Sequence, residues 1–382
     1  MLRLSLPVLA ILLPTCAIPI GSTLGTEMQN AAPEWLPFEH GVRAILVDRN
    51  GHFWFGTQEE GVARFDGQRF TRFTVEDGLA SNQIRRLYEA QDGTIWIETG
   101  TVVSSFDGTE LHTHTDKDYG AKQDWRARPH DLWFKGDQSV GISQLEGQPG
   151  VYRFDGRNLT WLTFPISGFT WKWTPEDLDG GNYFSVTTPA IRGKDGKLWF
   201  GTYGAVIGYD GRSFDILDNE RLGFDEETGF LHVRSLFVDS KGNLWIGNNG
   251  IGVLLHDGKT TINFSDLHGP RKEKASGSIP LLKSVFSISE DRDGNMWFGT
   301  SKHGAWRYDG ESWDNFSHEQ GLRSRNIWSF YIDKRGDLWI AGSEPGGIAR
   351  FDGVSFDMID GATDRPLSGS EGIPIPTGPA ER

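Results

Sequence analysis

The sequence DRDGNMWFGT at residues 291–300, followed by YDG at residues 308–310, decides the fold. Its pattern is D-x-x-G-x-Φ-W-Φ-G-T, where Φ is apolar, then a short gap and an aromatic residue before Asp-Gly. The pattern returns along the chain with some positions changed. Its tryptophan recurs at Trp54, Trp96, Trp133, Trp199, Trp245, Trp297 and Trp339, and its later Asp-Gly aspartate at Asp66, Asp107, Asp155, Asp210, Asp257, Asp309 and Asp352. The sequence therefore contains seven repeats of one unit.

Each repeat predicts four short antiparallel strands. Aromatic and β-branched runs are separated by Asn-Gly and Asp-Gly pairs, which favour tight hairpin turns because these residues tolerate positive φ. Four-stranded units repeated about every 40 to 50 residues are typical of propeller blades. We expect an all-β fold, a seven-bladed β-propeller of four-stranded antiparallel blades, over residues 34–360. Residues 34–38 are expected to close the ring by pairing with the last blade near Phe356.

The composition fits this architecture and excludes other classes. The 382 residues include 49 Gly and 15 Trp. One large ring per blade would fill the space between packed sheets, and glycine would close the turns. A hydrophobic content of 37% supports a core and argues against disorder. The net charge of -14 disfavours nucleic acid as a partner, because phosphate backbones bind clustered Lys and Arg.

The two ends of the chain differ from the repeats. Residues 1–22 have a basic start and a short apolar run interrupted by proline, which is typical of an export signal and too short to span a bilayer. Cys16 follows Leu-Pro-Thr, similar to a lipoprotein box, so lipidation at Cys16 and simple signal cleavage both remain open. Either interpretation makes the protein extracytoplasmic, in the periplasm or at the cell surface. The Pro- and Gly-rich residues 361–382 are predicted to be disordered.

Two stretches resemble a known repeat family. The sequence FDGQRFTRFTVEDGL at residues 65–79 and the form D-x-D-G-N-Φ-W-F-G-T are similar to the two-component regulator propeller repeat. The resemblance implies the extracytoplasmic sensor part of a membrane histidine kinase, many of which detect oligosaccharides. The sequence reads as a stand-alone exported propeller. We therefore expect a separate partner, a membrane sensor kinase or another envelope protein, and contact with a membrane only through a lipid anchor.

Long insertions point to one face of the propeller. The turns between strands one and two, and between strands three and four, are short in nearly every unit. The other end of the ring receives the insertions at residues 112–129, 135–150, 163–189, 217–232 and 265–283. Binding residues are usually carried by loops on a rigid scaffold, so we expect the ligand site on this face. Neutral drift of a surface is the alternative.

Candidate ligand-binding residues lie in these insertions and in the loops between strands two and three. Flat rings beside hydrogen-bonding side chains suit a saccharide, which presents apolar C–H faces and hydroxyl edges. The insertions contribute Trp125, Arg126, Trp171, Trp173 and Tyr183, and the loops contribute Lys135, Tyr203, Asn248, Lys302 and His303. A tryptophan that packs beneath a loop, or an ordinary turn residue, is the alternative in each case.

Three arginines share one position in the repeat. Arg43, Arg85 and Arg234 each lie 11 residues before the tryptophan of their unit, near the start of the innermost strand. Three guanidinium groups at one level of a central funnel would favour a carboxylate or sulfate. Pairing with an acidic residue of the next blade is the alternative.

An enzyme is the main rival to a binding protein. Propeller-fold lyases exist, and His303, Tyr203 and Arg234 would be the catalytic candidates; a protein-binding scaffold is a third interpretation. Residues 291–295 resemble the start of a calcium loop, but Lys302 stands where an EF-hand has Glu, so we interpret them as a hairpin turn. The pair His112 and His114 has no evident third ligand. We expect neither a metal nor a cofactor.

Overall fold

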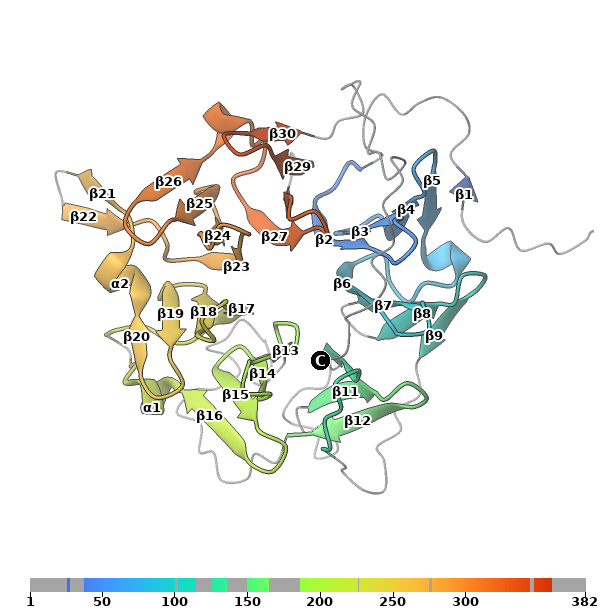
Figure 1. Cartoon of the computed structure of the whole chain (residues 1–382), viewed down its shortest axis with the longest axis horizontal. Coiled ribbons are helices and arrows are strands. Elements are labelled where there is room, and N and C mark those ends of the chain that lie inside the picture. The colour runs from blue at the N-terminus through green and yellow to red at the C-terminus, as the bar shows by residue number, and fades with distance from the viewer. Residues whose placement is uncertain are drawn as a thin grey trace, which may run out of the picture.

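The computed structural model describes residues 26–27, 38–99, 102–114, 125–135, 150–164, 186–225, 227–274, 277–343 and 347–358. The described chain forms seven sheets in a ring around a central opening, with chain order following the ring (Figure 1). This confirms the predicted seven-bladed β-propeller. The predicted export signal with Cys16, and the predicted tail at residues 361–382, lie outside the described residues.

Each blade runs from an innermost strand outward. The first four sheets contain β2 (Val42–Val47), β3 (Phe53–Thr57), β4 (Val62–Phe65) and β5 (Phe70–Phe73); β6 (Ile84–Glu89), β7 (Ile95–Thr99), β8 (Val103–Phe106) and β9 (Leu111–His114); β10 (Leu132–Lys135), β11 (Gly150–Phe154) and β12 (Leu159–Thr163); and β13 (Ile191–Arg192), β14 (Leu198–Gly201), β15 (Ala205–Tyr209) and β16 (Phe214–Asp218). Within its described residues the third sheet has three strands, β10 to β12, where the repeat predicts four.

The last three blades are regular. They contain β17 (Val233–Val238), β18 (Leu244–Asn248), β19 (Val253–His256) and β20 (Thr261–Asn263); β23 (Val285–Glu290), β24 (Met296–Thr300), β25 (Ala305–Tyr308) and β26 (Trp313–Phe316); and β27 (Ile327–Ile332), β28 (Leu338–Gly342), β29 (Ile348–Phe351) and β30 (Phe356–Met358). Outside these blades lie the strand β1 (Thr26–Glu27), which pairs with β5, and the hairpin of β21 (Arg271–Lys274) and β22 (Gly277–Pro280).

The first aspartate of the repeat and its tryptophan form a hydrogen bond that explains their spacing. In the turn between β23 and β24, Asp291 Oδ1 accepts the backbone N–H groups of residues 293 and 295, and Oδ2 accepts the indole N–H of Trp297 at 2.8 Å. The same Asp-to-Trp bond occurs at Asp48, Asp239 and Asp333. One carboxylate thus fixes both the turn and the ring. The turn at residues 291–295 is a hairpin, as predicted.

Each blade packs its tryptophan against the next blade. The Trp297 ring is fully buried and lies 4.9 Å from the Phe351 ring of the seventh blade. Two residues after each tryptophan, a small residue lets the neighbouring inner strand approach: a Cβ added to Gly56 would lie 2.5 Å from Ile84 Cγ2. Two blades break this rule, with Glu98 and Lys135 at the same position.

The ring closes by packing of the seventh blade on the first. Ala341 and Ile348 share one apolar core with Val42 and Phe53. Residues 34–37 of the expected closing strand lie outside the described residues, and the last residue of that strand, Phe38, does not contact the seventh blade near Phe356. Phe38 packs against Phe55 and Phe70 of the first blade, and the outer strand of the seventh blade is β30 itself.

Two described insertions contain short helices between blades. The helix α1 (Asn219–Leu222) follows β16, and α2 (Phe264–His268) follows β20 and precedes the β21–β22 hairpin. Because strands in a blade alternate in direction, these connections reach the end of the ring at which the inner strands begin. The described helices include none long and apolar enough to span a membrane.

Candidate ligand-binding site in the central channel

Five inner strands carry a β-bulge at the same position. The pairing of β2 with β3 shifts register between Val42 and Ala44, and equivalent shifts occur in β6, β17, β23 and β27. A bulge leaves one residue unpaired and redirects its side chain. The bulged residues are Arg43, Arg85, Arg234, Phe286 and Trp328, which we call the channel mouth.

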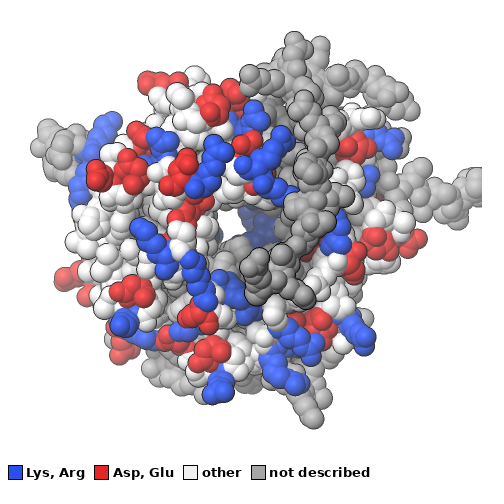
Figure 2. Space-filling model, viewed as in Figure 1, with Lys and Arg blue, Asp and Glu red and all other residues white. Residues whose placement is uncertain are grey.

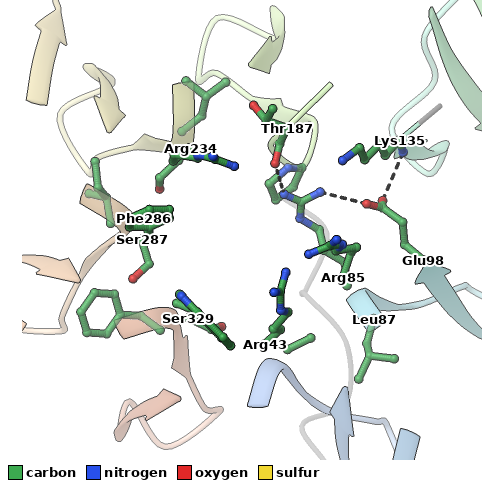
Figure 3. Close-up of a pocket in the computed structure, with 18 of the residues that line it drawn as sticks. Arg43, Arg85, Leu87, Glu98, Lys135, Thr187, Arg234, Phe286, Ser287 and Ser329 are labelled. Atoms are coloured by element: carbon green, nitrogen blue, oxygen red, sulfur yellow. Dashed lines mark hydrogen bonds and ion pairs between the residues drawn. The ribbon is translucent and has the colours of Figure 1, made fainter. Parts of the chain in front are cut away.

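The channel mouth lines a cavity of about 620 Å³ at the centre of the ring. Further lining residues include Arg86, Glu98, Lys135, Thr187 and Tyr203. Figure 2 shows Lys and Arg side chains at the wall of the central opening. In Figure 3, Arg43, Arg85, Arg234 and Lys135 extend from different blades into one shared space. The cavity is therefore basic, in a chain of net charge -14.

Aromatic rings hold two of the arginines. The guanidinium carbon of Arg43 lies 4.5 Å from the ring centroid of Trp328, its neighbour across the ring closure. The guanidinium carbon of Arg234 lies 5.3 Å from the Tyr203 centroid and 5.5 Å from the Phe286 centroid. A cation over an aromatic face is attracted without losing its charge or its N–H donors. These contacts position the arginines and leave them able to bind an anion.

Glu98 supplies the one acidic side chain among the described residues that line the cavity. Its carboxylate is almost fully buried and forms an ion pair with Arg86 at 3.0 Å, while the other Arg86 nitrogen donates to the Thr187 backbone oxygen at 2.8 Å. Glu98 also accepts the backbone N–H of Lys135 at 3.2 Å. Among the described residues, Glu98 therefore forms its ion pair with Arg86.

Burial shifts the pKa values of the cavity cations. Burial is the main cause that lowers the pKa of the Lys135 ammonium, to about 7; Glu98 opposes the shift, and Arg86, Arg85 and Arg234 add to it. Burial also lowers the pKa of the Arg85 guanidinium. Such shifts mean that the positive charges are crowded and poorly hydrated, which favours an anion among them.

The structure brings together five of the predicted ligand-binding residues. The cavity is lined by Arg43, Arg85, Arg234 and Tyr203, and by Lys135. The alternative was that each arginine pairs with an acid of the next blade. Within the described residues, Arg43 and Arg234 contact aromatic rings, and Arg85 contacts the side chain of Gln83.

Other predicted site residues have different surroundings. Trp125 stacks on Trp133 at 5.9 Å and donates its indole N–H to the Thr163 backbone oxygen, so it packs in the core between the third and fourth blades. Asn248 is fully buried, and its amide bonds the backbone at His232 and Ile246. Both residues are structural, because insertion or loop position alone does not fix the direction of a side chain.

The remaining candidates lie away from the cavity or outside the described residues. Lys302 and His303 are exposed in the loop after β24 and do not line the cavity, so the predicted catalytic set of His303, Tyr203 and Arg234 is not brought together. Burial and nearby Lys302 lower the pKa of the His303 imidazole. Arg126 is exposed. Trp171, Trp173 and Tyr183 lie outside the described residues.

The two histidines considered as metal ligands have separate partners. His114 stacks on Trp96 and lies 2.8 Å from the Ser105 hydroxyl, while His112 lies 3.5 Å from Asp107. Among the described residues, no group of three or more His, Cys, Asp or Glu side chains could hold a metal ion.

The sequence prediction missed Arg86, Glu98, Phe286 and Trp328. Phe286 and Trp328 stand 11 residues before their tryptophans, the same repeat position as the three arginines. Aligning the units on tryptophan would have identified them as channel residues. Glu98 could have been found as a charged residue where most units have glycine.

Comparison with known proteins agrees with this architecture. A protein-family model described as the two-component regulator propeller matches residues 37–59, 230–250, 281–302 and 321–344. A histidine kinase P4 from Formosa agariphila is 26% identical over 171 residues, which cover 41% of this chain and 12% of the kinase. The chain thus spans about an eighth of the length of this relative.

Solved structures share the fold. The extracellular domain of a putative hybrid two-component system, BT3049 from B. thetaiotaomicron, has a TM-score of 0.53 and 21% identity, covering 85% of this chain and 41% of the other. A catalytically inactive virginiamycin B lyase from Staphylococcus aureus has a TM-score of 0.54 and 13% identity, covering 85% and 97%. From its repeats and its ring of blades, the chain is a seven-bladed β-propeller, and four of its segments match the two-component regulator propeller repeat.

Proposed function

We propose that this chain is the ligand-binding part of an extracytoplasmic sensor, which binds a small molecule in its channel mouth and acts with a separate two-component signalling partner. The observation that carries the proposal is the set of bulged residues on five inner strands, all of which line one cavity. Ordinary strand pairing needs no such bulges, and bulges are common where a side chain is redirected at a functional site.

The family supports the signalling part of the proposal. The matched repeat is named for two-component regulators, and the similar proteins include a histidine kinase and the extracellular domain of a putative hybrid two-component system. The sequence of residues 1–22 supports export. An oligosaccharide is the ligand class that the resemblance to sensor propellers favours.

Mass spectrometry of the mature N-terminus would distinguish a lipid on Cys16 from simple cleavage.

A binding screen tests the first half of the proposal. The purified chain is titrated with neutral and acidic oligosaccharides in a calorimeter, and the reaction mixtures are analysed for new products. We expect saturable binding that Arg234→Ala weakens and Arg212→Ala does not, because Arg212 is exposed in the turn between β15 and β16, away from the cavity. Turnover of a ligand by the chain alone would instead support the lyase interpretation.

A cellular experiment tests the second half. The source organism, with its own gene replaced by the Arg234→Ala or Arg212→Ala form, receives the ligand found in the screen. Phosphorylation of its response regulators should rise with the Arg212→Ala form and not with the Arg234→Ala form. An unchanged response in both strains would overturn the sensor role even where binding is confirmed.

A further inference from the structure

We propose that the channel mouth binds a ligand with two or more oxyanionic groups, carboxylate or sulfate, through Arg43, Arg85, Arg234 and Lys135. This inference deepens the proposed function and rests on it for the role of the bound ligand. The binding chemistry itself follows from the cavity, and we call these four residues the mouth cations.

The three arginines among the mouth cations form no ion pair with a described residue. Arg43 and Arg234 are positioned by rings, and neither forms an ion pair with any residue that the structure describes. Arg85 has one long contact of 3.4 Å, to the neutral side chain of Gln83. A carboxylate partner would occupy the N–H donors of an arginine, whereas an aromatic face leaves these donors available to a ligand.

The cavity contains few acidic groups to balance these cations. Among the described lining residues, Glu98 faces five cations: Arg43, Arg85, Arg86, Arg234 and Lys135. Glu98 pairs with Arg86 at 3.0 Å, and its burial fixes it there. None of the mouth cations forms an ion pair in the described part of the cavity, and Glu98 is one negative charge against five positive groups, so the electrostatic potential there favours an anion.

One N–H donor of each arginine also lacks a hydrogen-bond acceptor. The Nε atoms of Arg43, Arg85 and Arg234 are buried and have no hydrogen-bond partner among the described residues. A buried N–H without an acceptor costs free energy, and for a charged group the cost is larger. An oxyanion that accepts these bonds would remove that cost, whereas a neutral hydroxyl would make weaker bonds.

The arrangement requires more than one anionic group. The mouth cations come from the first, second, third and fifth blades and extend into a cavity of about 620 Å³ from several sides (Figure 3). A guanidinium binds carboxylate or sulfate best through two parallel bonds, which commits one oxyanion to one or two arginines. A ligand with two or more such groups can contact cations on different sides of the cavity at the same time. Acidic oligosaccharides and compact polycarboxylates share this chemistry.

Calorimetry on the purified chain tests the inference. The probes are trigalacturonate and citrate for carboxylates, a sulfated disaccharide for sulfate, and maltotriose as the neutral control. We expect at least one anionic probe to bind in the channel, with affinity that falls as salt rises. Arg85→Gln and Arg234→Gln should each weaken that binding by at least about tenfold, because each removes a charge-assisted contact. Arg212→Gln, in its exposed turn, should bind as the original chain does.

The outcomes separate this inference from the proposed function. Maltotriose binding as tightly as the anions, or equal losses in all three variants, would overturn the inference. Failure of every anionic probe to bind the folded chain, checked by its thermal transition, would do the same. Anion binding that depends on Arg85 and Arg234 without any signalling response would uphold the site and reject the sensor. A signalling response to a neutral ligand would uphold the sensor role and reject the anion site.

Discussion

Asp291 Oδ2 accepts the indole N–H of Trp297 at 2.8 Å, and this bond links the turn that begins the second strand of the sixth blade to the ring that packs on the seventh. The other carboxylate oxygen bonds two backbone N–H groups of the same turn. The repeat spacing of six residues between the aspartate and the tryptophan is therefore the distance along the chain that one hairpin needs to bring them together.

Loss of this carboxylate should weaken the fold. Asp291→Ala leaves the buried indole N–H and two backbone N–H groups without their acceptor, so we expect a loss of about 1 to 3 kcal/mol in the free energy of unfolding. Urea unfolding of the full chain measures it. The control is Asp293→Ala, whose side chain is exposed in the same turn. Equal effects of the two substitutions would contradict the explanation.

Adding the missing carboxylate to the second blade should stabilise it. Ala90 stands where four of the blades have this aspartate, and its backbone forms the same turn, with its N–H bonded to the Thr94 oxygen. The indole N–H of Trp96 is buried and has no hydrogen-bond partner among the described residues. Ala90→Asp should therefore raise the free energy of unfolding by about 1 kcal/mol. The control Gln91→Asp adds the same charge at an exposed position and so separates this gain from a change of net charge. A lower thermal transition for Ala90→Asp would reject the prediction.

The closure of the ring depends on a glycine without a side chain. A Cβ added to Gly41 would lie 2.7 Å from the Gly342 oxygen and 2.8 Å from the Ser343 Cα, both in backbone of the seventh blade. Gly41→Ala should push the first and seventh blades apart and cost about 1 to 3 kcal/mol in the free energy of unfolding. Thermal unfolding and limited proteolysis measure the effect, with Arg212→Ala as the exposed control. Unchanged stability would show that the closure can relax.

Repeat spacing predicts the scaffold well, because every unit applies the same local physics. The Asp-Gly turns, the packed tryptophans and the level shared by Arg43, Arg85 and Arg234 all follow from positions that recur in each repeat. Residues outside these recurring positions are less predictable. Trp125 lies in an insertion but turns into the core, and Asn248 lies in a loop but bonds the backbone. Glu98 and Lys135 reach the cavity because they replace the small residue of other blades, which becomes informative only once blade packing is known.

The Asp-Gly turns predict a characteristic acid sensitivity. Backbone N–H groups that donate to the carboxylate lower the pKa of the aspartate in these turns, to about 2 in Asp210 and Asp309, and also lower it in Asp107, Asp155, Asp257 and Asp352. At Asp66 burial raises the pKa, but the same backbone bonds and nearby arginines outweigh it.

The sign of the effect follows from these lowered pKa values. The unfolded chain binds protons first, near the ordinary aspartate pKa of about 3.9, so this contribution to stability is complete above that pH. It is lost as the pH falls from about 4 to about 2. Urea midpoints measured across this interval should drop steeply, and those of Asp210→Asn less so. A midpoint that stays constant through the interval would contradict the turn assignment.

Anion binding should weaken as the pH rises through neutrality. The pKa of Lys135 is about 7, because burial lowers it and the neighbouring arginines add to the effect while Glu98 opposes it. Below that pH the ammonium adds a positive charge to the cavity, and above it the charge is lost. A bound anion stabilises the ammonium and raises its pKa, so binding takes up a proton near neutral pH. Calorimetry in buffers of different ionisation enthalpy measures this proton uptake directly. Lys135→Met should abolish both the uptake and the change of affinity near neutral pH, while the arginines still support weaker binding. If Lys135→Met kept the same pH profile, another titrating group would be responsible and Lys135 would have no part in the site.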